Sequence, residues 1–270
     1  MKLYFLGTCA SDFGPRLWTA LADKYDKDVR RSNAVLIDGQ LLIDCGDWIL
    51  NELEISGTDV SGIRRVLVSH SHHDHFRPDH LCAMALKAGH PLEIYANAAV
   101  LAKLQAQSEG LPGAELLVPH LLEANEGPAV VEFDGYTVTA LRSNHQTDVP
   151  GEQTMHFLVE KDGKSVFYGT DGAWLPTATG KYLYGKKLNC YLFDATCAEH
   201  EGEYRIYEHN TLPMIRMMVS VMRTQNVFAD DAKLVLVHLA PSLHKSHAET
   251  EVIAAKDGLT VAYDGMELEI

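Results

Sequence analysis

The chain has 270 residues, of which 46% are hydrophobic and 22% charged, as is typical of a soluble globular protein with a substantial core. Its formal net charge of −14 makes long RNA or DNA a poor partner, although a local positive site can still bind a small anion. The opening MKLYFLG lacks the pattern of a signal peptide, and no apolar run approaches the ~20 residues of a membrane helix. The five scattered cysteines include no C-x-x-C pair, so we expect reduced thiols in a cytoplasmic protein.

Short apolar runs alternate with segments of helical spacing along the first half of the chain. We expect strands at residues 2–6, 34–37, 41–44 and 64–69. We expect helices at residues 47–55 and 78–89. Asp38-Gly39 stands between two of these strands as a hairpin turn. The strand in RRVLVS at 64–69 is suited to burial on both faces of a sheet.

The second half of the chain continues in the same manner. We expect strands at residues 130–141 (a hairpin around Asp134-Gly135), 154–160, 165–168, 189–196 and 232–238. We expect helices at residues 211–222 and 247–256. No linker rich in proline, glycine or serine divides the chain, and it has no short repeat. Hairpins mixed with helices in both halves predict one α/β sandwich domain over residues 1–270.

Four histidines and one aspartate crowd into six positions of the stretch VLVSHSHHDHF at 66–76. His70 directly follows a strand, and alternate side chains of extended backbone share a face. His70, His72 and Asp74 therefore face one way, and a turn into the next helix brings His75 inward. His73 has the opposite parity, so we predict that it faces away. Imidazole and carboxylate ligands together suit Zn²⁺, Mn²⁺ or Fe²⁺.

Three later residues that can bind metals each follow an apolar strand: His145, Asp171 and His238. A single histidine after a strand is more often a solvated residue, and a single aspartate there is more often a turn or cap residue. Sites in α/β folds are nevertheless commonly built where strands end. Because all three occupy this kind of position, we expect them to join the cluster at residues 70–75.

These residues carry a family resemblance. SHSHHDH, the three later residues in that order, and LLIDCGD at 41–47 together resemble the metallo-β-lactamase superfamily over nearly the whole chain. The resemblance implies a four-layered αββα sandwich made of two similar halves. It also implies two divalent metal ions, zinc or manganese, with iron as an alternative. By this resemblance the ligands are His70, His72 and His145 on one ion, Asp74, His75 and His238 on the other, and Asp171 between them.

The implied centre suits hydrolysis. Two divalent ions, two carboxylates and a bridging hydroxide retain about one positive charge, and such a pair holds hydroxide at neutral pH. We therefore count Asp74 among the catalytic residues. The family's oxygen-reducing flavodiiron branch carries glutamate at the position of His72, so the histidine weighs against redox chemistry. Two-zinc β-lactamases typically lack an acidic residue at the position of Asp171, which weighs against antibiotic hydrolysis.

Five further segments resemble the phosphodiesterase branch of the family, which contains the tRNA 3′-processing ribonuclease and the phosphonate-pathway phosphodiesterase that opens phosphoribosyl cyclic phosphate. They are FLGT at 5–8, RSNAVLID at 31–38, VTALRSNH at 138–145, YGTDGAW at 168–174 and YDGMELEI at 263–270. The branch implies that His209 protonates the leaving alkoxide, since an imidazole has a suitable pKa. Asn210 or Thr211 would cap the helix that follows. The alternative is that His209 is merely a polar residue before a helix.

Two histidines close to His238 have no assigned part in the implied centre. His244 could contact a substrate phosphate, as could His247, but the favoured interpretation is that both are exposed polar residues before the last helix. Two features of the branch are missing. Residues 9–31 contain only Cys9, so the cysteine-rich structural zinc site of the phosphonate-pathway enzyme is absent. No long basic arm is inserted either, which weighs against a tRNA substrate.

The sequence thus predicts a cytoplasmic, dinuclear metal phosphodiesterase for a small anionic phosphodiester of cyclic or nucleotide-like structure. Three alternatives stay open at this point. The first is a lactone, thioester or carboxylic ester hydrolase that uses the same metal centre. The second, which is less favoured, is a tRNA 3′-end endonuclease. The third is a non-catalytic metal-binding module. Nucleic acid and membrane are not expected partners, while a second copy of the chain, in a homodimer, remains open.

Overall fold

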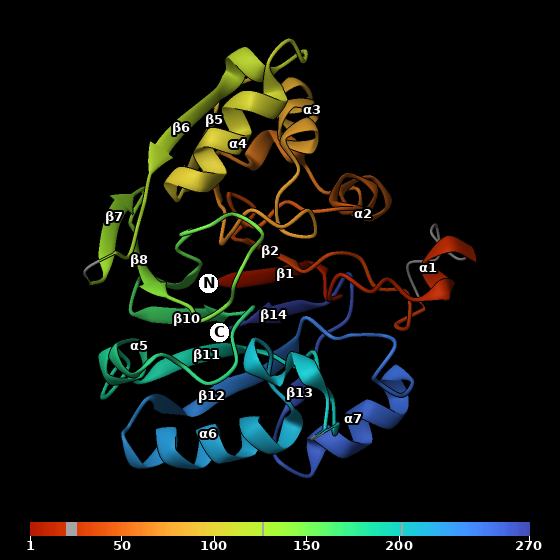
Figure 1. Ribbon diagram of the computed structural model, residues 1–270, viewed down its shortest axis with the longest axis vertical. Coiled ribbons are helices and arrows are strands. Elements are labelled where there is room, and N and C mark those ends of the chain that lie inside the picture. Colours follow the sequence, from red (N-terminus) through yellow and green to blue (C-terminus); the bar gives the residue numbers. More distant parts are fainter. Residues whose placement is uncertain (20–25, 126, 201) are drawn as a thin grey trace.

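Two mixed seven-stranded sheets face each other in the computed structural model, which describes residues 1–19, 26–125, 127–200 and 202–270 (Figure 1). The first sheet has the order β14 (Glu267–Glu269), β1 (Lys2–Gly7), β2 (Ala34–Ile37), β3 (Leu41–Ile43), β4 (Arg65–Leu67), β5 (Leu92–Ala96), β6 (Leu117–Leu121). The second sheet has the order β13 (Thr260–Val261), β12 (Phe228–Val237), β11 (Leu188–Asp194), β10 (Lys164–Gly169), β9 (Met155–Lys161), β8 (Tyr136–Arg142), β7 (Ala129–Phe133).

Helices cover the outer face of each sheet. The α-helices are α1 (Pro15–Thr19), α2 (Ile49–Ser56), α3 (Pro78–Ala88), α4 (Ala98–Ser108), α5 (Thr177–Tyr182), α6 (Leu212–Thr224) and α7 (His247–Ala255). Three 3₁₀ turns are η1 (Val60–Gly62), η2 (Ala114–Leu116) and η3 (Tyr204–Tyr207) in the described chain. Within the described residues no helix has the length and apolar character that a membrane crossing requires.

Three apolar layers hold the four structural layers together. The middle layer lies between the sheets and contains side chains of both, such as Val35 and Phe157. A second joins the first sheet to α2, α3 and α4, and a third joins the second sheet to α6 and α7. Strand β2, AVLI, is buried along its whole length because both of its faces are covered. The expected αββα sandwich is confirmed.

The two Asp-Gly pairs predicted as turns, Asp38-Gly39 and Asp134-Gly135, form turns, and so does Asp162-Gly163. Both residues of each pair have positive φ, with values of 47° to 51° for the aspartates and 69° to 79° for the glycines. Asp134-Gly135 and Asp162-Gly163 are two-residue hairpin loops of this backbone type, which matches the right-handed twist of the strands they join. Thr211 rather than Asn210 caps α6, since its side chain accepts a hydrogen bond from Met214 N at 3.3 Å.

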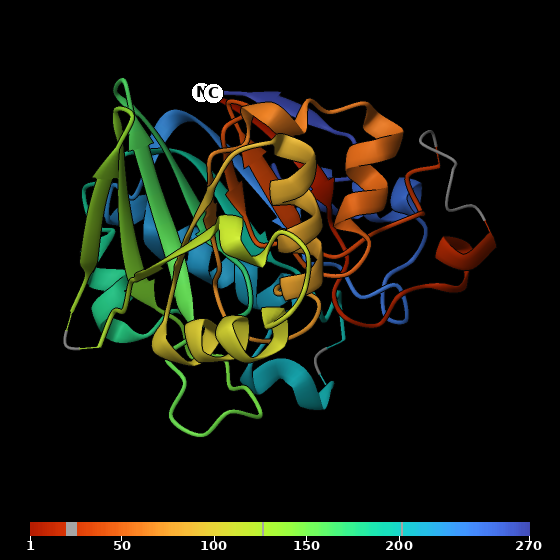
Figure 2. The ribbon, with the colours of Figure 1, turned by 90° about the horizontal axis from the view of Figure 1, so that it is seen from above.

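The closing segment YDGMELEI ties the end of the chain to its beginning. Figure 2 shows the two termini side by side, and Ile270 N donates to Met1 O at 3.1 Å. Asp264 accepts hydrogen bonds from Thr8 Oγ1 at 2.8 Å and from Arg31 N at 2.6 Å.

The buried Arg31 guanidinium lies between two carboxylates. Its Nη1 is 3.3 Å from Asp264 Oδ2 and 3.1 Å from Glu52 Oε2. Burial raises the pKa of Asp264 to about 6 and that of Glu52 to about 7, although Arg31 opposes both shifts. A buried cation of this kind needs anionic partners. The segment YDGMELEI therefore stabilises the fold by supplying Asp264 as a partner of Arg31.

We expect Asp264→Asn to lower the free energy of unfolding by about 3 kcal/mol, because it leaves the buried Arg31 with less compensation. Urea unfolding followed by circular dichroism measures the change. Glu267→Ala is the control, since its ion pair with Lys2 is exposed and should contribute under about 1 kcal/mol. Equal stability of the two variants would contradict the assigned role of Asp264.

Candidate metal centre

The residues expected to bind metal lie at the ends of strands from both sheets. His70 comes three residues after β4, and His145 comes three residues after β8. Asp171 comes two residues after β10, and His238 directly follows β12. Parallel pairing of β10, β11 and β12 brings their carboxyl ends to one edge of the second sheet. The structure therefore brings together side chains that are up to 168 positions apart, from His70 to His238.

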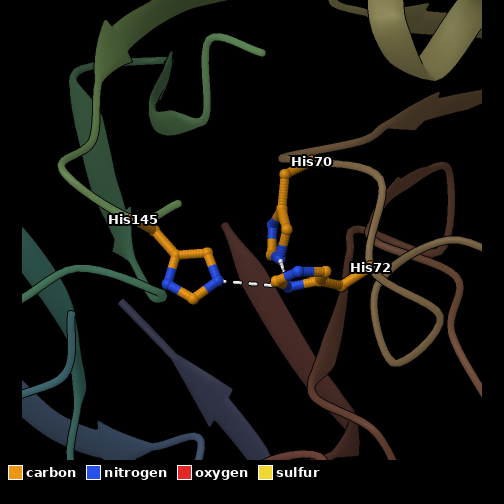
Figure 3. A group of neighbouring side chains, drawn as sticks. All are labelled: His70, His72 and His145. Atoms are coloured by element: carbon orange, nitrogen blue, oxygen red, sulfur yellow. Dashed lines mark hydrogen bonds between the residues drawn. The ribbon is translucent and has the colours of Figure 1, made fainter. Parts of the chain in front are cut away.

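Three imidazole nitrogens converge in the first group of ligands. His72 Nδ1 lies 3.0 Å from His70 Nε2 and 3.1 Å from His145 Nε2 (Figure 3). Burial lowers the pKa of His145 to about 3 and that of His70 well below its usual range, so both rings are neutral. Nitrogens that bind one tetrahedral zinc ion lie about 3.3 Å apart, given Zn–N distances near 2.05 Å. The three side chains fit one metal ion.

A second group lies beside the first. His75 Nε2 is 3.2 Å from His238 Nε2, and Asp74 Oδ2 is 3.4 Å and 3.6 Å from these two nitrogens. Asp171 stands between the groups: its Oδ2 is 2.9 Å from His75 Nε2, and its Oδ1 is 3.8 Å from His145 Nε2. This donor set, with one carboxylate facing both groups, fits a second divalent ion.

Oxygen atoms contact the other ring nitrogen of four of these histidines. The pairs are Ser69 Oγ with His70 Nδ1 at 3.0 Å, Asp44 Oδ2 with His75 Nδ1 at 2.8 Å, Thr196 Oγ1 with His238 Nδ1 at 2.8 Å, and Glu208 Oε2 with His145 Nδ1 at 3.3 Å. The first three contacts are hydrogen bonds, which fix the ring orientation and leave Nε2 to face the centre. His72 differs, because it presents Nδ1.

His73 lies outside both groups, as its parity predicts. Its side chain is 63% exposed, and Nδ1 is 2.6 Å from Asp47 Oδ2. It belongs to none of the sets of described side chains that could share an ion.

Asp194 belongs to this site but was not predicted from the sequence. It ends the apolar strand β11, a position like those of Asp171 and His238, and this pattern could have revealed it. Its Oδ2 lies 2.7 Å from His209 Nδ1 and accepts a hydrogen bond from Asp171 N at 3.1 Å. Its Oδ1 accepts a hydrogen bond from Thr196 N at 3.0 Å.

His209 stacks on His238 at 5.4 Å between ring centroids. Burial by itself would lower the pKa of His209, but the charge of Asp194 and the hydrogen bond to it raise this pKa to about 9. Four side chains here, Asp171, Asp194, His209 and His238, lie close enough to hold an ion. The Asp194 oxygens, however, already accept hydrogen bonds from Asp171 N, Thr196 N and Thr196 Oγ1, which leaves them less free to bind an ion.

The expected exposure of His244 and His247 is wrong. His244 Nε2 lies 2.6 Å from Ala195 O, and burial lowers the pKa of this ring to about 4. His247 is buried, with Nδ1 3.0 Å from Arg30 Nη2. Both rings contact residues that are far away in the sequence, and local sequence patterns do not reveal such contacts. Contact of His244 with a substrate stays a prediction.

A cavity of about 400 Å³ adjoins the first group and is lined by residues 142–147 and 149–154, which include His145. Glu152 fastens this loop to its surroundings. Its carboxylate accepts hydrogen bonds from Ser71 Oγ, from Thr147 Oγ1 at 2.7 Å and from Asn97 Nδ2 at 3.0 Å. Because Ser71 separates His70 from His72, the loop is held in a fixed position relative to these two histidines.

Comparison with known proteins agrees with this geometry. Ribonuclease Z from Pyrococcus abyssi (strain GE5 / Orsay) is 29% identical over 143 residues, which are 50% of this chain and 44% of that protein. The chain thus spans less than half the length of this curated relative.

Two solved structures share the fold over the whole chain. A diphosphatase from the PhnP family has a TM-score of 0.75 at 20% identity, with 100% of this chain and 97% of that chain covered. The short form of human tRNase Z has a TM-score of 0.73 at 20% identity, with coverage of 100% and 99%.

The sequence profile described as the beta-lactamase superfamily domain matches residues 40–239. This range is well over half of the chain and contains every residue of the two ligand groups. The chain therefore belongs to the metallo-β-lactamase superfamily.

Proposed function

We propose that this protein is a dinuclear metal-dependent hydrolase that cleaves a small phosphodiester of cyclic or nucleotide-like structure. The observation that carries the proposal is the pair of converging donor groups with Asp171 between them. Zinc or manganese fits the mixture of imidazole and carboxylate donors, and iron is an alternative. The five cysteines are free and buried, which supports a cytoplasmic location.

The proposed ligands follow from the two groups. They are His70, His72 and His145 for one ion, Asp74, His75 and His238 for the other, and Asp171 for both. When bound, two such ions supply an activated water and stabilise the charge that develops on a phosphoryl group. Asp74 and Asp171 then hold the positions of the ions and offset part of their charge. Bound ions also replace the protons that the buried imidazoles would otherwise need beside these carboxylates.

We propose His209 as the general acid and Asp194 as the residue that positions it. The Nδ1 atom of His209 faces Asp194, so Nε2 carries the proton that can be transferred to a leaving oxygen. The pKa of His209, about 9, keeps the ring protonated near neutral pH. Cations bound nearby would lower this pKa and make the proton easier to release.

A phosphodiester is favoured over a carboxylic ester because the site has a proton donor beside both ligand groups. His209 Nδ1 is 3.9 Å from Asp171 Oδ1, and the ring contacts those of His145 and His238. A sugar alkoxide is a poor leaving group and needs such a donor. The relatives named a ribonuclease and a diphosphatase also act at phosphorus, which supports the same choice.

The proposed reaction can be tested with a substrate panel. We expect zinc- or manganese-loaded protein to hydrolyse bis(p-nitrophenyl) phosphate and at least one cyclic nucleotide or phosphoribosyl cyclic phosphate. Lactones and thioesters in the same assay should react much more slowly. Faster lactone turnover would instead indicate an acyl hydrolase. Metal uptake with no turnover of any ester would indicate a binding module.

The ligand assignment predicts opposite results for two neighbouring histidines. Wild-type protein should contain about two equivalents of metal, and His72→Ala should lower this to about one with a large loss of rate. His73→Ala should keep both, because this side chain is exposed and pairs with Asp47. Mass spectrometry of the purified proteins measures metal content. Full metal content in His72→Ala, or its loss in His73→Ala, would refute the assignment.

The role of His209 predicts a dependence on the leaving group. His209→Asn should slow hydrolysis of a cyclic nucleotide roughly 100- to 10,000-fold, because a sugar alkoxide must be protonated as it leaves. Hydrolysis of bis(p-nitrophenyl) phosphate should slow much less, since nitrophenolate leaves without a proton. The metal content should be unchanged. Equal loss of kcat on both substrates would show that His209 has some other role.

A further inference from the structure

Trp174 is a half-exposed aromatic residue held in an unusual backbone conformation. It follows Asp171 by three positions, and the residue is 46% exposed. Its φ angle is +41°, a left-handed value that bulky residues rarely adopt. Residues in such conformations persist only when surrounding contacts hold them, and they concentrate at functional sites.

Two asparagine side chains hold the backbone around Trp174. Trp174 N donates to Asn210 Oδ1 at 3.0 Å, and Asn210 Nδ2 donates to Gly172 O at 2.8 Å. From the other side, Asn144 Nδ2 donates to Ala173 O. Each asparagine is thus bonded to the short segment that leads from Asp171 to Trp174.

Asn144 directly precedes His145 in the sequence, and Asn210 directly follows His209. The rings of the two histidines lie 5.1 Å apart between centroids. The backbone of Trp174 is therefore fixed beside the proposed general acid and a proposed metal ligand. A phosphodiester held by the two ligand groups would therefore be bound close to the Trp174 backbone.

The indole of Trp174 is available to a ligand. Within the described part of the chain it makes no ring-to-ring contact, whereas Trp48 stacks edge-on against both Phe13 and Trp18. Two more exposed aromatic residues, Tyr204 and Tyr207, lie in η3, just before His209 in sequence, with 79% and 82% exposure. Figure 2 shows η3 and the loop between β8 and β9 projecting from the same side of the molecule.

We propose that Trp174 is a stacking platform for a nucleobase, so that the phosphodiester cleaved at this site belongs to a nucleotide. This inference rests on the proposed function and narrows its substrate class. A flat, half-exposed indole gains most from a planar partner, and a nucleobase is the planar group that biological phosphodiesters carry. Fixed backbone geometry favours stacking, because this segment of the chain need not be ordered when a ligand binds.

The test compares AMP with ribose 5-phosphate, which differ only by the base. Isothermal titration calorimetry of zinc-loaded protein should show that AMP binds at least about ten-fold tighter. Trp174→Leu should weaken AMP binding by about ten-fold and ribose 5-phosphate binding by less than about two-fold. Trp174→Tyr should keep most of the affinity for AMP, which controls for a folding defect. Tyr184→Ala removes an aromatic residue of similar exposure, 48%, outside the site and should change neither affinity.

Equal affinity of the wild-type protein for AMP and ribose 5-phosphate would overturn the proposal. So would an equal loss of both in Trp174→Leu, because the indole would then support the loop and not the base. Failure of the proposed reaction would appear separately, as absent turnover of bis(p-nitrophenyl) phosphate. Base-dependent AMP binding without turnover would still support the stacking role.

Discussion

The charge of the buried carboxylates Asp74 and Asp171 is the constraint on which the rest of the site depends. An ionised carboxylate without a positive partner is very costly to bury. Burial would raise the pKa of Asp171, but positive charge on His238 and His75 holds it well below the usual range. Without metal, protons on neighbouring imidazoles must supply that positive charge. Two divalent ions supply it more fully, so the electrostatic demand of the fold and the demand of hydrolysis coincide.

Backbone conformation turns these side chains toward one another. Asp44, Asp171 and His238 have φ angles of +63°, +53° and +55°, which residues other than glycine seldom adopt. Each comes within two residues of the end of a strand. At the point where regular pairing stops, the strained turns bring the Asp171 and His238 side chains together and place Asp44 against His75. Hydrogen bonds hold the turns, as when Asp171 N donates to Asp194 Oδ2.

Local patterns predicted much of this architecture, and contacts between distant residues account for what they missed. Asp-Gly turns and buried apolar strands identify themselves, because their backbone and burial requirements are local. The region of β5, α4 and β6 was not predicted. Helix α4, AAVLAKLQAQS, has only a weakly separated apolar face. His247 looked exposed because its partner, Arg30, lies 217 positions away. The alternation of side chains in the cluster at residues 70–75 predicted that His73 faces away from the ligands. Asp194 was missed because its place in the site depends on which strands are neighbours in the sheet.

That strand order links the proposed acid to the proposed metal centre. Strand β11 lies between β10 and β12, so Asp194 at its end stands between the residues that follow the two flanking strands, Asp171 and His238. One carboxylate therefore accepts a hydrogen bond from the backbone of Asp171 and also faces His209 Nδ1. A shift of β11 relative to its neighbours would move the proton donor and the Asp171 carboxylate together. The alignment of Asp194 with Asp171 and His238 is thus a property of the sheet, which explains how a site drawn from widely separated segments keeps its geometry.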